Sequence, residues 1–198
     1  MRSIAVLSGA AAACGSTTAT RPGRGVQILT AHDSAVEEET RQQLERLFEL
    51  HDLSRWRFTR RIVVDERAIP HSHPVLTLHT RHLRDDLLLL STYVHEQSHW
   101  WADRHPRPTE AAIAELTALF PDLPVGHPDG ADSRESNYNH LIVIFLEWDG
   151  LRRLVGELAA RQVMDFWATD HYRVLYRTVL AHRSGIRAIV RRHRLDPP

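Results

Sequence analysis

Apolar and polar residues along the first half of the chain follow patterns that predict one helix and then two strands. Residues 34–50 carry leucines at helical spacing behind Ser34, a residue type that caps helix N-termini, and this predicts an amphipathic helix. Residues 56–66 and 74–80 alternate loosely between apolar and polar side chains, as half-buried strands do. The expected order is therefore helix, strand, strand.

The second half of the chain is predicted to be almost entirely helical. The helical pattern that begins near Asp85 should end before Pro106, because the residue preceding a proline avoids the helical conformation. Further helices are expected at 109–120, 140–163 and 171–191, with a loop at 121–136. Helices that surround and follow two strands predict an α+β fold, with residues 26–198 forming a single domain.

Charge and cysteine content exclude several classes of site. The chain carries 25 basic and 25 acidic residues, and this balance gives no sign of the excess positive charge that nucleic-acid binding requires. Cys14 is the single cysteine, so the chain can form neither an intrachain disulfide nor a cysteine-rich structural zinc site. The 14 histidines, in contrast, supply many candidate metal ligands.

Residues 1–25 have the features of a targeting segment. Arg2 provides a positive start, an apolar run follows over residues 4–13, and small residues precede Cys14. This order predicts an export signal, and the run is too short to span a bilayer, which takes about twenty residues. The segment before Cys14 resembles the lipobox of bacterial lipoproteins, which implies a lipidated cysteine. We therefore favour an exported or lipid-anchored protein on the outer side of a bacterial membrane over a cytoplasmic one, with a disordered leader as the alternative.

The segment His95-Glu96-Gln97-Ser98-His99 lies within the helix predicted from Asp85. Histidines four positions apart share one face of a helix, close enough to bind one metal ion, and imidazole nitrogen suits Zn²⁺. Glu96 follows the first of them and would lie beside the metal ion. A carboxylate there can take a proton from a water whose acidity the metal has raised, which favours a hydrolytic site.

This segment resembles the active-site helix of the zincin metallopeptidases, and residues 74–80 resemble the edge strand that lines their substrate cleft. The resemblance implies that His95 and His99 bind Zn²⁺ and that Glu96 is the general base. It also implies a small mixed sheet packed on the active-site helix, a helical C-terminal half, and an edge strand that pairs with an extended peptide. The expected function is a zinc-dependent hydrolase, a metallopeptidase with a peptide or protein substrate.

Three residues compete to be the third metal ligand that a catalytic zinc site needs. We favour His140, because a polar side chain entering a strongly apolar helix needs a partner. Glu147 lies two helical turns further on the same face, so one of the pair could bind the metal while the other orients a ligand. His105 has the spacing of the metzincin motif, but that family has glycine where this chain has Ala102.

Two further groups of residues have both a functional and an ordinary structural interpretation. Four histidines near the second strand have the residue type for a second metal cluster, but surface or hydrogen-bonded roles are favoured for them: His71, His73, His79 and His82. Tyr172 could donate a hydrogen bond to a reacting oxyanion, but a place in the apolar stripe of the last helical stretch is favoured. Competing functions are a non-catalytic, exported histidine-rich metal-binding protein and a domain of this fold with a purely structural zinc.

Overall fold

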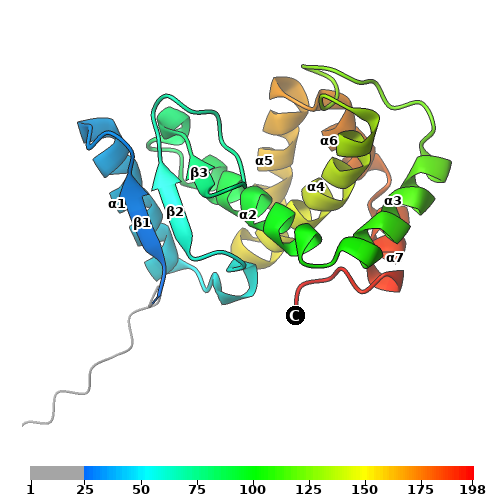
Figure 1. Ribbon diagram of the computed structural model, residues 1–198, viewed down its shortest axis with the longest axis horizontal. Coiled ribbons are helices and arrows are strands. Elements are labelled where there is room, and N and C mark those ends of the chain that lie inside the picture. The colour runs from blue at the N-terminus through cyan, green and yellow to red at the C-terminus, as the bar shows by residue number, and fades with distance from the viewer. Residues whose placement is uncertain (1–24) are drawn as a thin grey trace, which may run out of the picture.

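The computed structural model describes residues 25–198, so Cys14 and the leader predicted around it lie outside the described residues. The described part of the chain contains seven helices and three short strands, which confirms the α+β class (Figure 1). In chain order these elements are β1 (Gln27–Thr30), α1 (Ala35–Leu50), β2 (Arg61–Val64), β3 (Leu76–Leu78), α2 (Asp86–Asp103), α3 (Pro106–Leu119), α4 (Arg134–Val155), α5 (Glu157–Asp170), α6 (Arg173–Ala181) and α7 (Arg183–Arg192).

The three strands form one parallel sheet in the order β1-β2-β3, with Ile62 of β2 paired to Ile28 and to Leu76. The prediction of a mixed sheet was wrong, since the one antiparallel contact among the described residues is an isolated bridge between His71 and Thr77. Parallel neighbours need a crossover connection, and α1 provides it between β1 and β2. β1 was not predicted because its four residues are too few to establish a period.

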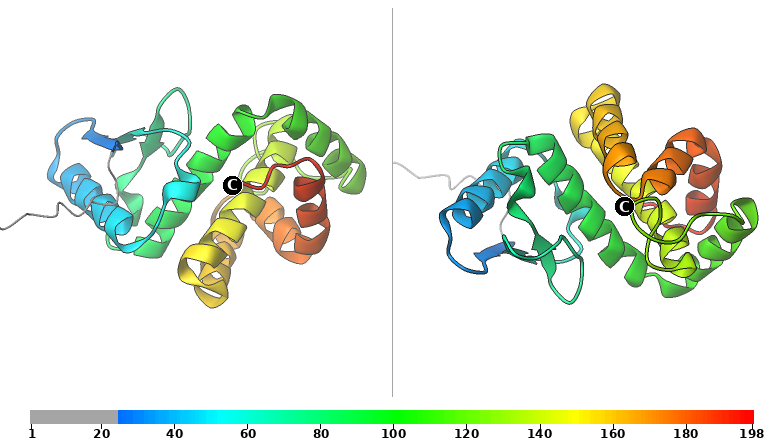
Figure 2. Two further views of the ribbon diagram at one scale, coloured as in Figure 1. Left: turned by 90° about the horizontal axis from the view of Figure 1, so that it is seen from below. Right: turned by 90° about the horizontal axis from the view of Figure 1, so that it is seen from above.

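Helix α2 lies between the two halves of the molecule. The sheet and α1 lie on one side of it, and helices α3 to α7 lie on the other, as the views in Figures 1 and 2 show. Every residue of α2 from Leu88 to Ser98 is buried. Buried polar side chains cost free energy unless they are paired, so Ser91 and His95 in this stretch require partners from the elements around it.

Helix α4 packs closely against α2. A Cβ atom added to Gly150 would lie 2.8 Å from Nε1 of Trp56 and 2.9 Å from Cγ1 of Val94 in α2. These distances are shorter than any ordinary carbon contact, so the absence of a side chain at Gly150 lets the two helices approach. The approach matters for function because α2 carries the histidine motif and α4 carries His140.

Several helix boundaries differ from those expected from the sequence. Ser34 caps α1 as predicted, accepting a hydrogen bond from the backbone N–H of Glu37. Helix α3 begins at Pro106 rather than at 109, because a proline at the first helical position loses no hydrogen bond. The predicted helix at 140–163 is two helices separated at Gly156, whose φ of 84° is left-handed. The stretch 171–191 is likewise divided, into α6 and α7.

One hydrophobic core cluster joins the two sides of α2. It includes Leu44 of α1, Ile62 of the sheet, Tyr93 of α2, Trp148 of α4 and Leu195 near the C-terminus. Within residues 25–198, no helix is long and apolar enough to cross a membrane.

Candidate metal centre

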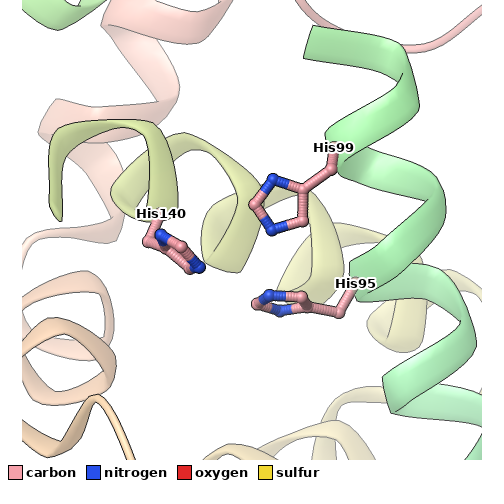
Figure 3. Close-up of side chains that lie close together, drawn as sticks. All are labelled: His95, His99 and His140. Carbon is pink, nitrogen blue, oxygen red and sulfur yellow. The ribbon is translucent and has the colours of Figure 1, made fainter. Parts of the chain in front are cut away.

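Three histidines from two helices converge where α2 packs against α4 (Figure 3). His95 and His99 extend from the same face of α2, with ring centroids 5.1 Å apart. His140 of α4 faces both, with ring centroids 5.7 Å from His95 and 4.9 Å from His99. One ring nitrogen from each residue can be chosen so that all three lie within 4.8 Å of one another. The site residues favoured from the sequence therefore come together.

Hydrogen bonds orient two of the three imidazole rings. Nδ1 of His95 donates to a carboxylate oxygen of Glu147 over 2.8 Å, and Nδ1 of His140 donates to the backbone carbonyl of Ser136 over 2.7 Å. Both acceptors lack a proton to give, so Nδ1 carries the hydrogen in each ring. In the neutral form of each ring, Nε2 then has a lone pair, and this is the form that binds a metal ion.

Glu147 positions His95 and does not join the three histidines. Its side chain is fully buried, and it accepts hydrogen bonds from the hydroxyls of Ser91 and Tyr176 as well as from His95. The indole N–H of Trp167 donates to the Ser91 hydroxyl over 2.8 Å. Residues from α2, α4, α5 and α6 are therefore linked through one carboxylate, and that carboxylate fixes the orientation of the first histidine.

Burial and the hydrogen bond to Glu147 shift the pKa values of the three histidines in different directions. It lowers the pKa of His140 to about 3 and the pKa of His99 well below its usual value. Burial alone would also lower the pKa of His95, but the hydrogen bond to Glu147 outweighs it and raises that pKa. His99 and His140 are thus held neutral at physiological pH, as metal ligands must be.

Glu96 is nearly buried, with 7% of its surface exposed, yet its carboxylate is free of protein donors. The carboxylate of Glu147 accepts hydrogen bonds from Ser91, His95 and Tyr176, whereas the carboxylate of Glu96 accepts none within residues 25–198. Burial raises the pKa of Glu96 to about 7, although positive charge on His95 and His71 would lower it. The site thus combines three convergent imidazoles with an unpaired carboxylate beside them.

His105, the third candidate ligand, lies away from this cluster. Helix α2 ends at Asp103, and His105 occupies the residue before α3, where its Nδ1 donates to the backbone carbonyl of Trp101 over 2.8 Å. Its ring packs on the indole of Trp101 at 3.9 Å between centroids. His105 is therefore outside the cluster, although α2 ends before it and does not carry it further along the same helix.

The second histidine cluster does not form among the described residues. His71 bonds the carbonyl of Ile69, His73 stacks on Trp100, His79 bonds the carbonyl of Glu66, and His82 packs edge-on against Trp167. His71, His73 and His79 therefore have the surface or hydrogen-bonded roles favoured from the sequence, whereas His82 is buried and packs against Trp167.

One other group within residues 25–198 has ligand-like spacing: His32, Glu37 and Asp65. No motif in the sequence marks this group, because Asp65 follows β2, far along the chain from His32 and Glu37. Glu37 already accepts hydrogen bonds from the ring and the backbone N–H of His32 and from the backbone N–H of Glu66. These hydrogen bonds account for the group without a metal ion.

Tyr172 lies beside the metal centre, and its expected place in an apolar helical stripe was wrong. It precedes α6 with a φ of 48°, in the left-handed region, and its ring packs on His140 at 4.5 Å between centroids. The neighbouring His171 donates from Nδ1 to Asp170 over 2.8 Å, and Arg81 binds the same carboxylate. No periodic signal could place this corner, because it is an interruption between two helices.

Comparison of the chain with protein-family models, with curated proteins and with solved structures gave no match.

Proposed function

We propose that this protein is a zinc-dependent hydrolase in which His95, His99 and His140 bind the metal ion and Glu96 is the general base. The observation that carries the proposal is the convergence of three imidazoles beside a carboxylate that has no protein donor. Three neutral nitrogen ligands fit Zn²⁺ in a tetrahedral site and leave a fourth position open, as catalytic zinc sites do.

Glu96 and Glu147 have different roles in the proposed hydrolysis. Zinc, when bound, lowers the pKa of a water and polarises a carbonyl oxygen. Glu96 takes the proton that the attacking water gives up and delivers it to the departing amine or alcohol. Glu147 holds the ring of His95 in the orientation and tautomer that binding requires. An amide or ester is the substrate class that this arrangement serves, with peptides as the favoured amides.

A metal-buffering role is less well supported. Buffering favours several ions per chain, but the other histidines near the sheet are engaged in hydrogen bonds or ring packing, as His71, His73, His79 and His82 are. Within residues 25–198 only one cluster of three histidines remains. We therefore expect one zinc ion per chain.

A purely structural zinc is also less well supported. A structural site closes all four positions with protein ligands, whereas the described residues provide three histidines. A structural role also gives no function to the Glu96 carboxylate, which follows His95 in α2 and accepts no hydrogen bond from the described residues. In hydrolysis, the same carboxylate acts as the general base.

The substitution Glu96→Gln tests the proposed role of the base. The amide keeps the size of the side chain and cannot take a proton, so we expect unchanged zinc content and a loss of hydrolysis of about 10²–10⁴-fold. Zinc would be measured by elemental analysis, and activity with chromogenic amides and esters. The exposed Glu110→Gln in α3 is the matched control and should match the wild type. Equal activity in Glu96→Gln and the wild type would overturn the assignment.

A further inference from the structure

Strand β3 lies at the edge of the sheet, but its outward hydrogen-bonding groups are already paired. The backbone N–H of Thr77 donates to the carbonyl of His71 over 2.8 Å, and the N–H of His71 donates to the carbonyl of Thr77 over 3.1 Å. Thr77 is the central residue of this three-residue strand. The backbone N–H and carbonyl of Leu78 point to the opposite side, towards β2. The Leu78 carbonyl accepts a hydrogen bond there from the backbone N–H of Asp65.

The segment that covers this edge, residues 66–75, is fastened to α2 just beyond the histidine motif. Nε1 of Trp100 donates to the carbonyl of Ser72 over 2.8 Å. The ring of His73 stacks on Trp100 with centroids 4.0 Å apart, and its Nε2 lies 3.2 Å from the carboxylate of Asp103. We call residues 66–75 the covering loop.

The covering loop joins β3 to the part of α2 that carries the histidine motif. His71 pairs with Thr77 of β3. His73 packs on Trp100, the residue of α2 that follows His99. The loop therefore occupies the space in which an extended chain would have to pair with β3 to reach the metal.

On the side of the metal centre away from the covering loop, Tyr172 and the start of α6 are fixed by contacts with neighbouring segments. Tyr172 packs on His140, and the start of α6 is tied to the preceding loop by two backbone hydrogen bonds, from Arg173 to Pro128 at 3.0 Å and from Val174 to Asp129 at 3.1 Å. Three residues of the centre expose little surface, with 7% of His95, 7% of Glu96 and 9% of His140 accessible, and His99 is half-buried.

From this geometry we infer that the site accepts compact amides or esters and does not accept an extended polypeptide laid along β3. The inference rests on the proposed hydrolase function and narrows its substrate class. The pairing of a peptide with the edge strand, expected from the zincin resemblance, has no free donor or acceptor at Thr77. A substrate would instead enter with its reacting group first, between the covering loop and Tyr172.

Ligand binding to the full-length protein loaded with Co²⁺ tests this inference without requiring turnover. The visible absorption of Co²⁺ would be followed during titration with acetohydroxamate and with a hexapeptide hydroxamate, which share the metal-binding group. Each main-chain hydrogen bond gained by a paired strand would tighten binding about fivefold. We expect affinities within about threefold of each other, and a peptide that binds about 30-fold more tightly would overturn the inference.

The substitution His71→Pro is the matching gain-of-binding variant. Proline removes the N–H that the Thr77 carbonyl accepts, and so breaks one of the two hydrogen bonds that hold the covering loop on the edge of β3. We expect the hexapeptide hydroxamate to gain about fivefold over acetohydroxamate in this variant, and to gain nothing in the exposed loop control Ile69→Ala. An unchanged ratio in His71→Pro would contradict the blocking role of the loop.

The same titration separates failure of the inference from failure of the proposed function. Tight binding of the peptide alone overturns the substrate class and leaves the hydrolase proposal standing. If neither hydroxamate changes the Co²⁺ spectrum, the metal has no open position, and the hydrolase proposal falls together with the inference.

Discussion

At the scale of single residues, the site depends on polar groups that α2 buries almost completely. His95, Glu96 and Ser91 lie in a stretch of helix where every side chain is buried. His95 and Ser91 are both satisfied by the carboxylate of Glu147, and that carboxylate is itself satisfied by Tyr176. A single buried carboxylate thus serves several partners, and its removal affects all of them.

Glu147→Gln is expected to weaken zinc affinity by about 10–100-fold, since a carboxylate that orients a histidine ligand contributes about that much. The glutamine keeps the shape of the side chain but offers one acceptor oxygen in place of two. Affinity would be measured by competition with a chromophoric chelator. The exposed Glu135→Gln at the start of α4 is the control. An affinity equal to that of the wild type would show that Glu147 does not position His95.

The sequence allowed the ligands to be predicted but not the residues that support them. His95 and His99 are four positions apart on one helix, so their proximity is a local property. His140 could be argued from a polar residue in an apolar helix. Tyr176 and Trp167 reach Glu147 and Ser91 only through the packing of α5 and α6, and no spacing along the chain encodes that contact.

At the scale of elements, the distance between α2 and α4 determines whether His140 can reach the motif. Gly150 sets that distance, because a side chain there would collide with Trp56 and Val94. The zinc site therefore depends on a residue that contributes no ligand and lies almost three helical turns from His140.

Gly150→Ala is expected to destabilise the fold by about 1–3 kcal/mol, as overpacking of a tight contact does, and to weaken zinc binding. Gly185→Ala in α7 is the matched control, since its added Cβ would meet nothing within 4 Å and alanine favours a helix by about 1 kcal/mol. Urea unfolding and chelator competition would measure both effects. Equal destabilisation by the two substitutions would contradict the packing argument.

Glu37 stabilises the junction between α1 and the sheet in a pH-dependent way. Burial alone would raise the pKa of Glu37, but hydrogen bonds from His32 and Glu66 outweigh it and lower that pKa to about 2. Because the folded pKa lies below the unfolded value of 4.5, the stabilisation is present above pH 4.5 and is lost as the pH falls towards 2.

Glu37→Gln should therefore lower the free energy of unfolding by up to about 3 kcal/mol at pH 6 and have a much smaller effect near pH 2. Urea unfolding at several pH values measures this difference. The exposed Glu39→Gln, two residues further along α1, controls for the loss of one negative charge. A destabilisation by Glu37→Gln that is independent of pH would rule out the carboxylate as its source.

The pattern of apolar residues predicted most elements and misplaced several boundaries. Long periods such as those of α1 and α2 are robust, because many residues contribute to them. The break at Gly156 was missed because the apolar pattern continues across it into α5. The mixed sheet was expected from the zincin resemblance alone. The strand β1, which the pattern did not predict, makes the first parallel crossover together with α1.

At the scale of the whole molecule, the proposed zinc ion joins α2 to α4 in a fold that already has a continuous core. The hydrophobic cluster runs from Leu44 to Leu195 and includes residues of both helices. We therefore expect the protein to remain folded without metal, unlike small domains whose folding depends on zinc.

Removal of zinc by a chelator should lower the melting temperature and leave the helical circular dichroism at 25 °C unchanged. Metal present at about a thousand times its dissociation constant adds about 4 kcal/mol to the stability of the folded state. His99→Ala, which lacks a ligand, should show no response to the chelator. Loss of helical signal in the wild type on chelation would favour the structural-zinc alternative.

The most direct test of the central claim is the zinc content of the purified protein, measured by elemental analysis. Our account predicts one zinc ion per chain in the wild type and in His105→Ala, and none or almost none in His95→Ala, His99→Ala and His140→Ala. A wild type without zinc, or a His140→Ala variant that keeps its zinc while His105→Ala loses it, would contradict the account.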